Sequence, residues 1–303
     1  MISHRLLLLA AGVAGTAGTL PANDAADPLA SPYGTDRFGN APPASFTYAF
    51  PSAIRLGDTA LGDIDSAEFA ASYVESVGGG RDWHWLVGAN WRRQQFDPPA
   101  SAPLPDTLQA AAAAVGANWR INNRWRARVE LLPGVYSDFR DVSGDDVNVP
   151  ALIEGAYRFN DNLEVGVQLN VDAFRESPIV GTVGVSWRFA DDWRLALWIP
   201  RPQIEYTIDD QWAAFVGASF GGGSYRVADD FGKDAGRADL GGEVVDFQEV
   251  RVGAGVRYIA LERLAIELAG GWMIDRRFHF HERDVLVNGD GAPYIQFSLG
   301  AVW

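Results

Sequence analysis

The chain has 303 residues, of which 48% are hydrophobic, and a formal net charge of -14 at pH 7. This composition excludes disorder for most of the chain, and the acidic balance argues against a nucleic-acid partner, which needs basic patches. The absence of cysteine excludes disulfide bonds, a thiolate nucleophile, Cys-ligated zinc and a lipid anchor attached to cysteine.

The N-terminal residues have the pattern of an export signal. His4 and Arg5 precede an apolar stretch that runs from Leu6 to about Gly18, and small residues follow. That stretch is too short to span a bilayer as a helix. We therefore expect a cleavable signal peptide over residues 1–22.

Residues 23–45 follow this signal and have no hydrophobic periodicity. They are rich in Pro, Gly and Asp, so we expect a flexible periplasmic leader. The alternative is a plug that folds into the interior of the domain that follows.

From residue 46 onward, apolar residues recur at every second position, which indicates β-strands. In residues 82–92, for example, one face carries Trp83, Trp85, Val87, Ala89 and Trp91. The runs span roughly 10 to 13 residues, whereas strands of soluble proteins usually have about five or six. The opposite face is small or polar with few lysines, which is typical of a barrel with lipid outside and a polar lumen inside.

The alternating runs predict fourteen strands. They cover residues 46–56, 67–77, 82–93, 107–121, 124–137, 150–159, 163–174, 179–189, 193–200, 203–208, 212–224, 246–259, 263–276 and 292–303. The first is the weakest because Pro51 interrupts it, so twelve strands are the alternative. An even number suits a bacterial single-chain barrel.

Short and long connections alternate along the chain. The short ones are Asn122–Asn123, Asn160–Asn162, Asp191–Asp192, Asp209–Asp210 and Leu261–Arg263; the long ones are Phe96–Asp106, Asp138–Val149, Arg175–Pro178, Tyr225–Val245 and Phe278–Gly291. This alternation is typical of periplasmic turns and extracellular loops. Trp125, Trp193 and Trp212 open the strands after short turns, which predicts an aromatic girdle; tryptophans in the core of a soluble sandwich are the alternative.

The last predicted strand ends at the C-terminal residue. Apolar side chains alternate there, at Ile295, Phe297, Leu299, Ala301 and Trp303. The pattern resembles the C-terminal assembly signal of bacterial outer-membrane β-barrels, with Trp in place of the commoner Phe.

That resemblance implies an all-β fold, a transmembrane antiparallel up-and-down β-barrel over residues 46–303 in the bacterial outer membrane. It also implies that outer-membrane lipid and lipopolysaccharide are partners, and that the barrel-assembly machinery reads these five residues during insertion. In overall pattern the chain is most similar to uncharacterised barrel families of domain-of-unknown-function type, which imply no substrate.

Three histidines outside the signal, His84, His279 and His281, would have to supply any hydrolase chemistry. The stretch His279–Asp284 offers two imidazoles and carboxylates, a donor set that binds metals, but it falls in a predicted solvated loop. The chain has no Gly-x-Ser-x-Gly or His-Glu-x-x-His motif. We therefore expect no catalytic site, no metal and no cofactor.

Charged residues at lumen-facing positions are the stronger functional candidates. They are Arg120, Arg126, Arg128, Glu130, Glu154, Arg158, Glu164, Gln168, Asp172, Arg188, Arg194, Glu249, Arg251, Arg257, Glu267 and Asp275, with one neutral amide among them. Both signs are present, and such pairs set pore size and ion preference. The sequence predicts a porin-like passive channel for small polar solutes or ions. The alternatives are a structural or adhesive barrel without transport and a barrel-embedded hydrolase using His84, His279 or His281.

Overall fold

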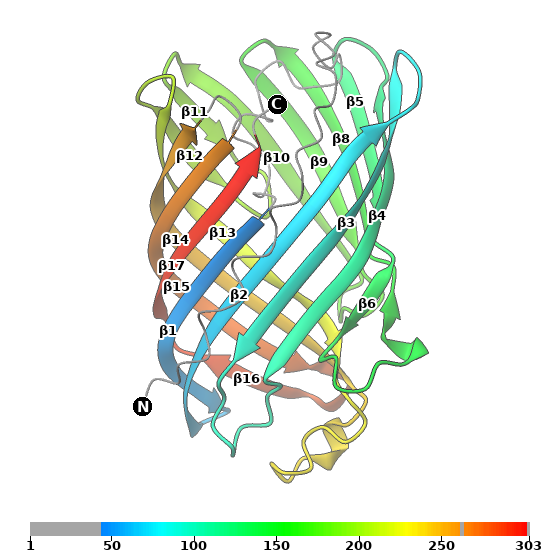
Figure 1. Ribbon diagram of the computed structural model, residues 1–303, viewed down its shortest axis with the longest axis vertical. Coiled ribbons are helices and arrows are strands. Elements are labelled where there is room, and N and C mark those ends of the chain that lie inside the picture. Colours follow the sequence, from blue (N-terminus) through cyan, green and yellow to red (C-terminus); the bar gives the residue numbers. More distant parts are fainter. Residues whose placement is uncertain (1–43, 261–263, 302–303) are drawn as a thin grey trace.

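The computed structural model describes residues 44–260 and 264–301, and its described residues form a closed antiparallel barrel of fourteen wall strands (Figure 1). The wall strands are β1 (Ala44–Leu56), β2 (Thr59–Val77), β3 (Trp83–Phe96), β4 (Thr107–Arg120), β5 (Trp125–Leu131), β8 (Ala151–Asn160), β9 (Leu163–Val171), β10 (Ile179–Ala190), β11 (Trp193–Ala196), β12 (Gln203–Thr207), β13 (Trp212–Arg226), β14 (Val244–Ala260), β15 (Leu264–Phe280) and β17 (Ala292–Ala301).

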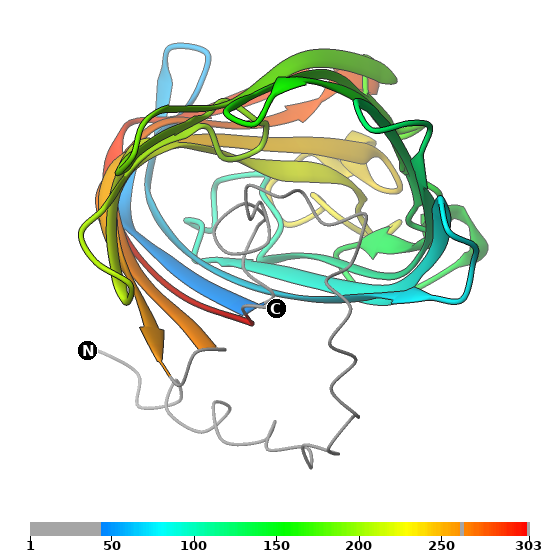
Figure 2. The ribbon, with the colours of Figure 1, turned by 90° about the horizontal axis from the view of Figure 1, so that it is seen from above.

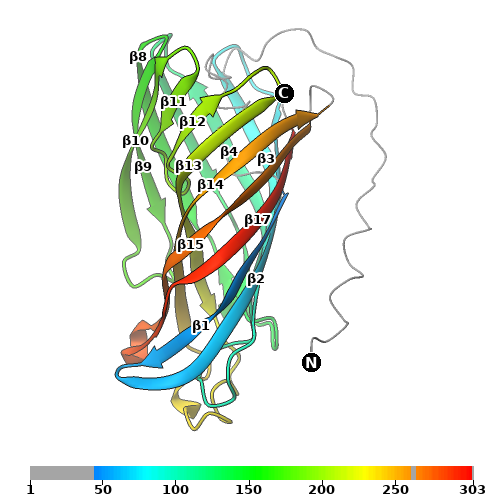
Figure 3. The ribbon, with the colours of Figure 1, turned by 90° about the vertical axis from the view of Figure 1, so that its left-hand side faces the viewer.

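Each wall strand pairs with the next, and β1 pairs with β17 to close the ring. The closing strands lie side by side in Figure 3, and Figure 2 shows the ring along its axis. Three shorter strands, β6 (Gly134–Ser137), β7 (Val147–Asn148) and β16 (Val285–Gly289), extend the wall. The predicted fold class and the count of fourteen are confirmed.

The two ends of the barrel differ in their connections. At the short-turn end, uppermost in Figure 1, β4 is joined to β5, β8 to β9, β10 to β11 and β12 to β13 by two to four residues. At the long-loop end lie residues 97–106, 138–150, 172–178, 227–243 and 281–291. The predicted alternation of connection lengths is therefore present, with one short exception at the long-loop end, the β1–β2 turn.

Side chains explain why the short turns form. The Asn122 carboxamide oxygen accepts from the backbone N–H of Arg124 at 2.9 Å and of Trp125 at 3.0 Å. Asp209 does the same for Gln211 and Trp212, both at 2.8 Å. Such side-chain acceptors replace backbone partners in tight turns.

Aromatic rings gather on the outer wall beside these turns. The rings of Trp125 and Tyr157 lie 4.8 Å apart, and those of Trp212 and Tyr258 lie 4.7 Å apart. Trp125 is 47% exposed, so it faces outward. This is the predicted girdle, and it marks the headgroup level of a bilayer.

The outer surface between the ends is apolar. Val183 is 66% exposed, Leu268 59% and Trp272 51%. A water-soluble protein does not expose a continuous apolar band of this kind, whereas a bilayer covers it. No helix in the described part of the chain is long and apolar enough to cross a membrane.

Some element boundaries differ from the sequence predictions. β1 begins at Ala44, inside the predicted leader, and absorbs Pro51 through a register shift between Ala49 and Ser52. β15 continues to Phe280, so the predicted loop over 278–291 instead holds a strand end, a short 3-10 helix η3 (His281–Arg283) and β16. The predicted signal peptide, the turn 261–263 and Trp303 lie outside the described residues.

Candidate functional site

The lumen wall is formed by alternate side chains of the strands. On β14, Glu249, Arg251 and Arg257 are 4–5% exposed, while Val252 and Val256 between them are 37% and 41% exposed. The charged residues therefore face the interior and the valines face lipid. The chemistry of the barrel interior depends on how these inward charges are arranged.

Arg251 is the centre of one buried network. Its guanidinium donates to the Glu249 carboxylate at 2.7 Å, to Thr47 at 3.0 Å and to Glu68. The side chains of Arg251 and Glu249 are 6% and 5% exposed. Buried charges are stable only when they are paired, so this network ties β14 to β1 and β2.

Arg257 is the centre of a second network. It donates to Glu267 at 3.0 Å and to Glu205, and Arg201 reaches the same Glu267. The side chains of Arg257, Glu205 and Glu267 are 4–6% exposed. This network joins β12, β14 and β15 with the segment before β12.

The inward arginines of β5 and β8 are more exposed than those of β14, although the Glu164 carboxylate that Arg126 and Arg158 contact is buried. Arg126 lies 2.7 Å from Glu164 and 3.2 Å from Glu154, and Arg158 lies 3.7 Å from Glu164. The side chains of Arg126 and Arg158 are 32% and 24% exposed. Solvent therefore reaches the guanidinium groups on this side of the lumen.

Two arginines form hydrogen bonds with strands that are not their neighbours in the wall. Arg92 of β3 donates to the backbone carbonyl of Gly222 on β13 at 2.8 Å, although these strands are not neighbours in the wall. Arg276 of β15 is fully buried and donates to the Ser66 hydroxyl of β2 at 2.7 Å. Two small cavities, one lined by Glu68, Glu249 and Arg251 and the other by Arg201, Phe215 and Tyr294, have volumes of about 10 and 20 Å³, room for one or two water molecules.

Trp198 narrows another part of the lumen. A Cβ atom built on Gly184 would lie 2.2 Å from the Trp198 ring, and one on Gly166 would lie 2.6 Å from it. Any side chain at these positions of β9 and β10 would collide with the indole. The two glycines therefore make the space in which Trp198 lies against the inner wall.

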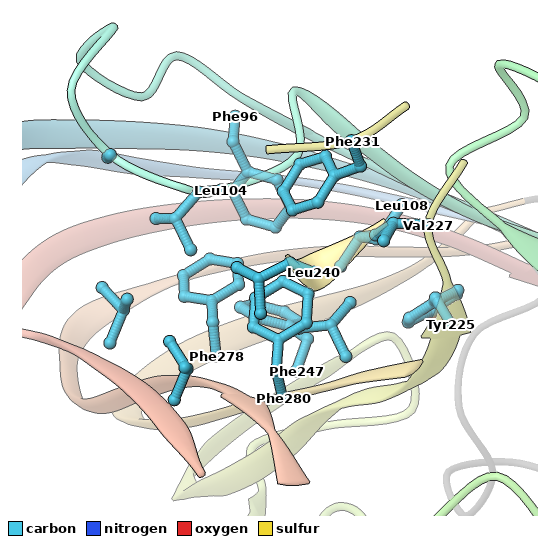
Figure 4. Close-up of a cluster of buried hydrophobic side chains, with 14 of the residues drawn as sticks. Phe96, Leu104, Leu108, Tyr225, Val227, Phe231, Leu240, Phe247, Phe278 and Phe280 are labelled. Atoms are coloured by element: carbon cyan, nitrogen blue, oxygen red, sulfur yellow. The ribbon is translucent and has the colours of Figure 1, made fainter. Parts of the chain in front are cut away.

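Apolar side chains fill the long-loop end of the lumen (Figure 4), and we call this group the mouth cluster. Its members are Ile54, Ile64, Phe96, Ala102, Leu104, Leu108, Tyr225, Val227, Phe231, Leu240, Val245, Phe247, Phe278, Phe280, Val285 and Val287. The rings of Phe96 and Phe247 lie 5.1 Å apart, and those of Phe247 and Phe278 lie 4.8 Å apart.

The mouth cluster continues the polar face of the lumen. Phe247 lies two positions from Glu249 on the same strand, and Phe278 lies two positions from Arg276, so each phenylalanine faces inward. Leu104 and Phe231 join the cluster from the loops 97–106 and 227–243. Sequence reasoning missed this group, although large aromatics at lumen-facing positions were the signal for it.

The remaining predicted lumen residues occupy three kinds of place. Glu130 pairs with Arg128, and Gln168 lies opposite Glu154 across β8 and β9. Arg120 lies at the short-turn end, 3.1 Å from Asp82, and Arg188 is directly opposite Arg194. Asp172 lies beyond the end of β9, where its carboxylate accepts from Asn148 at 2.6 Å.

Asp275 is placed differently from its predicted position. A register shift near Ile274 of β15 moves it to the side of the exposed Arg277, whose guanidinium is 3.0 Å away, and not to the side of the buried Arg276. A bulge reverses the facing of every residue beyond it. The two-residue period alone does not reveal where such a reversal occurs.

His84 is remote from the other two candidate histidines, His279 and His281, whose rings lie 6.3 Å apart. His84 lies on β3 near the short-turn end, 3.1 Å from the carbonyl of Gly78. At the long-loop end, His279 lies 3.2 Å from Glu176 and His281 lies 3.6 Å from Asp246. Within residues 44–260 and 264–301, no three His, Asp or Glu side chains are grouped as ligands for a metal ion.

Comparison with solved structures finds several outer-membrane proteins of similar architecture. The COG4313 outer membrane channel from Pseudomonas putida F1 is 11% identical, with a TM-score of 0.41, over 88% of this chain and 98% of that one. The TodX monoaromatic hydrocarbon channel deltaS2 mutant is 9% identical, with a TM-score of 0.41, over 86% and 90%. The KdgM porin in complex with disordered oligogalacturonate is 6% identical, with a TM-score of 0.31, over 84% and 98%.

Identities and TM-scores this low say nothing about the substrate of this chain. No curated protein matches the sequence. A family model described as "Domain of unknown function (DUF6268)" matches residues 78–298, from the β2–β3 turn to β17. The match covers more than half of the sequence, in agreement with the predicted resemblance to uncharacterised barrel families, and the chain therefore belongs to the DUF6268 family.

Proposed function

We propose that this barrel is an outer-membrane channel for small polar solutes or ions, and that the mouth cluster closes it in the conformation described. The observation that supports a channel is the set of solvent-exposed arginines on the lumen face of β5 and β8. Arg126, Arg128 and Arg158 remain 24–32% exposed although their strand positions face the lumen. Water that reaches such groups gives polar solutes a path that a packed core would not give.

The apolar outer band and the aromatic girdle support a position across the outer membrane. In this orientation the short-turn end faces the periplasm and the long-loop end faces the outside of the cell. The mouth cluster then lies at the outer entrance, and the arginines and glutamates lie between it and the periplasmic end.

The mouth cluster has the composition expected of a gate. Leu104, Phe231 and Leu240 come from loops, and the other large members belong mainly to strand ends. Displacement of the loop 227–243 would withdraw Phe231 and Leu240 without breaking the wall pairing of β13 with β14. Apolar constrictions block ions because water leaves them.

The decisive experiment compares single-channel currents of the refolded wild type with those of Phe231→Asp in planar bilayers. Phe231 is 5% exposed and stacks on Phe280 with ring centroids 5.7 Å apart, so a carboxylate there would expel the loop. We expect few or no steps from the wild type and frequent steps from the variant. Val142→Asp is the matched control, since Val142 is 51% exposed on another long loop.

The close packing of the mouth cluster also favours one competing function, a structural barrel without transport. In that case neither the wild type, nor Phe231→Asp, nor a variant with residues 228–242 replaced by a short linker would conduct. Absence of steps from all three folded proteins would refute the channel.

A further inference from the structure

Five arginines lie close together on the inner wall at the short-turn end, at the other end of the barrel from the mouth cluster. We call this group the arginine belt, and its members are Arg120, Arg126, Arg158, Arg188 and Arg194. Each lies within two residues of the end of its strand, on β4, β5, β8, β10 and β11 respectively. Two carboxylates lie at equivalent positions beside the belt, Glu164 on β9 opposite Arg158 and Glu205 on β12 opposite Arg194.

Strand register produces two pairs of like charges in the belt. Arg120 lies directly opposite Arg126, and Arg188 lies directly opposite Arg194. Like charges at directly opposite positions destabilise a sheet. Cross-strand pairing alone therefore does not account for both arginines of each pair, and nearby carboxylates, Asp82 beside Arg120, Glu164 beside Arg126 and Glu205 opposite Arg194, offset part of their charge.

Elsewhere on the lumen wall, directly opposite charges are of opposite sign. The register pairs Arg128 with Glu154, Arg158 with Glu164, Arg194 with Glu205 and Arg257 with Glu267. The two arginine pairs are thus the departure from the pattern. These two arginine pairs also contribute the excess of positive charge on this part of the lumen wall.

The lumen face of β4 to β12, all of it described, carries six arginines and four glutamates, an excess of two positive charges. The arginines are the belt and Arg128, and the glutamates are Glu130, Glu154, Glu164 and Glu205, the last of which lies directly opposite Arg194. Elsewhere on the lumen wall, Arg92, Arg201, Arg251, Arg257 and Arg276 lie among Glu68, Glu249 and Glu267, and most of these side chains are buried.

Three arginines of the belt are exposed to solvent, whereas the Nε atoms of Arg158 and Arg194 are buried. The side chains of Arg120 and Arg126 are 26% and 32% exposed, and Arg188 is exposed as a residue. Asp82, which pairs with Arg120, lies in the turn outside the wall. Exposed Asp161, Asp191 and Asp192 also lie in the short turns and oppose the field of the belt from the rim.

We infer that the arginine belt is an anion site that selects small solutes bearing a carboxylate or phosphate-type group at the periplasmic end of the channel. This inference rests on the proposed channel function. Guanidinium groups donate paired hydrogen bonds to such anions. A charged wall around a water-filled path concentrates ions of opposite sign, even though the whole chain carries a net charge of -14.

The test uses a variant that removes the excess charge. In Arg188→Glu with Arg120→Gln, the pair on β10 and β11 becomes a Glu–Arg pair like those elsewhere in the wall, which favours folding. The control is Arg140→Glu with Arg124→Gln, the same loss of three charges outside the lumen. Arg140 is 61% exposed at the long-loop end, and Arg124 bonds the outward-facing Tyr157.

Reversal potentials in a tenfold KCl gradient give the selectivity, with Phe231→Asp as the conducting background. We expect chloride to be favoured over potassium by at least about twofold, a ratio near one in the belt variant, and no change in the control. Thermal unfolding of the detergent-refolded proteins at low salt gives a second measurement that needs no conductance. Pyrophosphate should raise the Tm of the wild type and of the control, but that of the belt variant by less than half as much.

The outcomes separate the two proposals. Steps that favour potassium, with no effect of pyrophosphate, would overturn the anion site while leaving the channel intact. A pyrophosphate effect that the belt variant loses, without steps from any protein, would support the anion site and refute the channel. Equal selectivity in the belt variant and its background would also overturn the assignment of the belt.

Discussion

Substitution of Arg251 by alanine should destabilise the barrel strongly. The change removes the cation that Glu68 and Glu249 share, and their side chains are 14% and 5% exposed. Removing one partner of a buried ion pair costs about 3–5 kcal/mol because a charge is left buried and unpaired. Of its two arginine partners, Glu68 would retain Arg92, whose guanidinium is 3.7 Å away.

The matched control is Arg55→Ala. Arg55 forms an ion pair with Asp290 at 3.2 Å, but the two side chains are 54% and 52% exposed. Exposed pairs contribute about 0–1 kcal/mol. The difference between the two variants therefore measures the effect of burial and not the number of salt bridges.

Urea unfolding of the detergent-refolded proteins, followed by tryptophan fluorescence, gives both free energies. With a slope of about 2–3 kcal/mol per molar urea, Arg251→Ala should lower the midpoint by about 1–2 M, and Arg55→Ala by a few tenths at most. A double variant with Arg251→Met and Glu68→Gln should recover part of the loss, since Glu249 keeps the buried Arg276 directly opposite it on β15 as a cationic partner. If Arg251→Ala and Arg55→Ala shifted the midpoint equally, the Arg251 network would have to be fully hydrated. The distinction between the buried Arg251 network and the exposed arginines of β5 and β8 would then be refuted.

Three further changes probe the turns, the inner wall and the lipid-facing surface. Asn122→Ala removes the acceptor for two backbone N–H groups in the β4–β5 turn and should cost about 1 kcal/mol, measured as a lower Tm. Gly184→Val should prevent the Trp198 ring from lying against β10, because a Cβ atom there would be 2.2 Å from the indole; quenching of tryptophan fluorescence by acrylamide should increase. Phe297→Asp places a charge on the outer wall at a residue 43% exposed, and heat-modifiable mobility on gels should show a loss of membrane-inserted protein.

Two controls accompany these changes. Gly144→Ala should leave the Tm unchanged, since nothing lies within 4 Å of a Cβ built there. Gln296→Asp changes the residue next to Phe297 on the inner face and should insert normally. Normal insertion of Phe297→Asp would contradict the lipid-facing position of Phe297. An unchanged acrylamide response of Gly184→Val would contradict the packing of Trp198 against β10. An unchanged Tm of Asn122→Ala would contradict the role of the Asn122 side chain in the turn.

The sequence predicted the barrel because the relevant signals are local. Alternation of side chains between two faces is a property of each strand, and the acceptors at Asn122 and Asp209 act within their own turns. The strand count, the connection lengths and the outward tryptophans follow from these signals. They needed no knowledge of which strands meet across the lumen.

The facing of individual charges was harder to predict. Asp275 was expected inside, and the bulge at Ile274 turned it toward Arg277. Arg188 and Arg194 were each expected to face the lumen, but their direct opposition appears only in the register of β10 with β11. Bulges and register depend on hydrogen bonding between strands, which a period of two along one strand does not encode.

By itself, the sequence determined a barrel with an apolar outside, a charged inside and unequal ends. Only the tertiary structure decided what occupies those ends. Phe96, Phe247 and Phe278 are far apart in the chain and meet because strand tilt and closure bring their inward faces together, where loop residues such as Phe231 complete the packing. Barrel closure also brings the five arginines of the belt together at the short-turn end. The charge of that end depends on which strands are neighbours and not on the composition of any single strand.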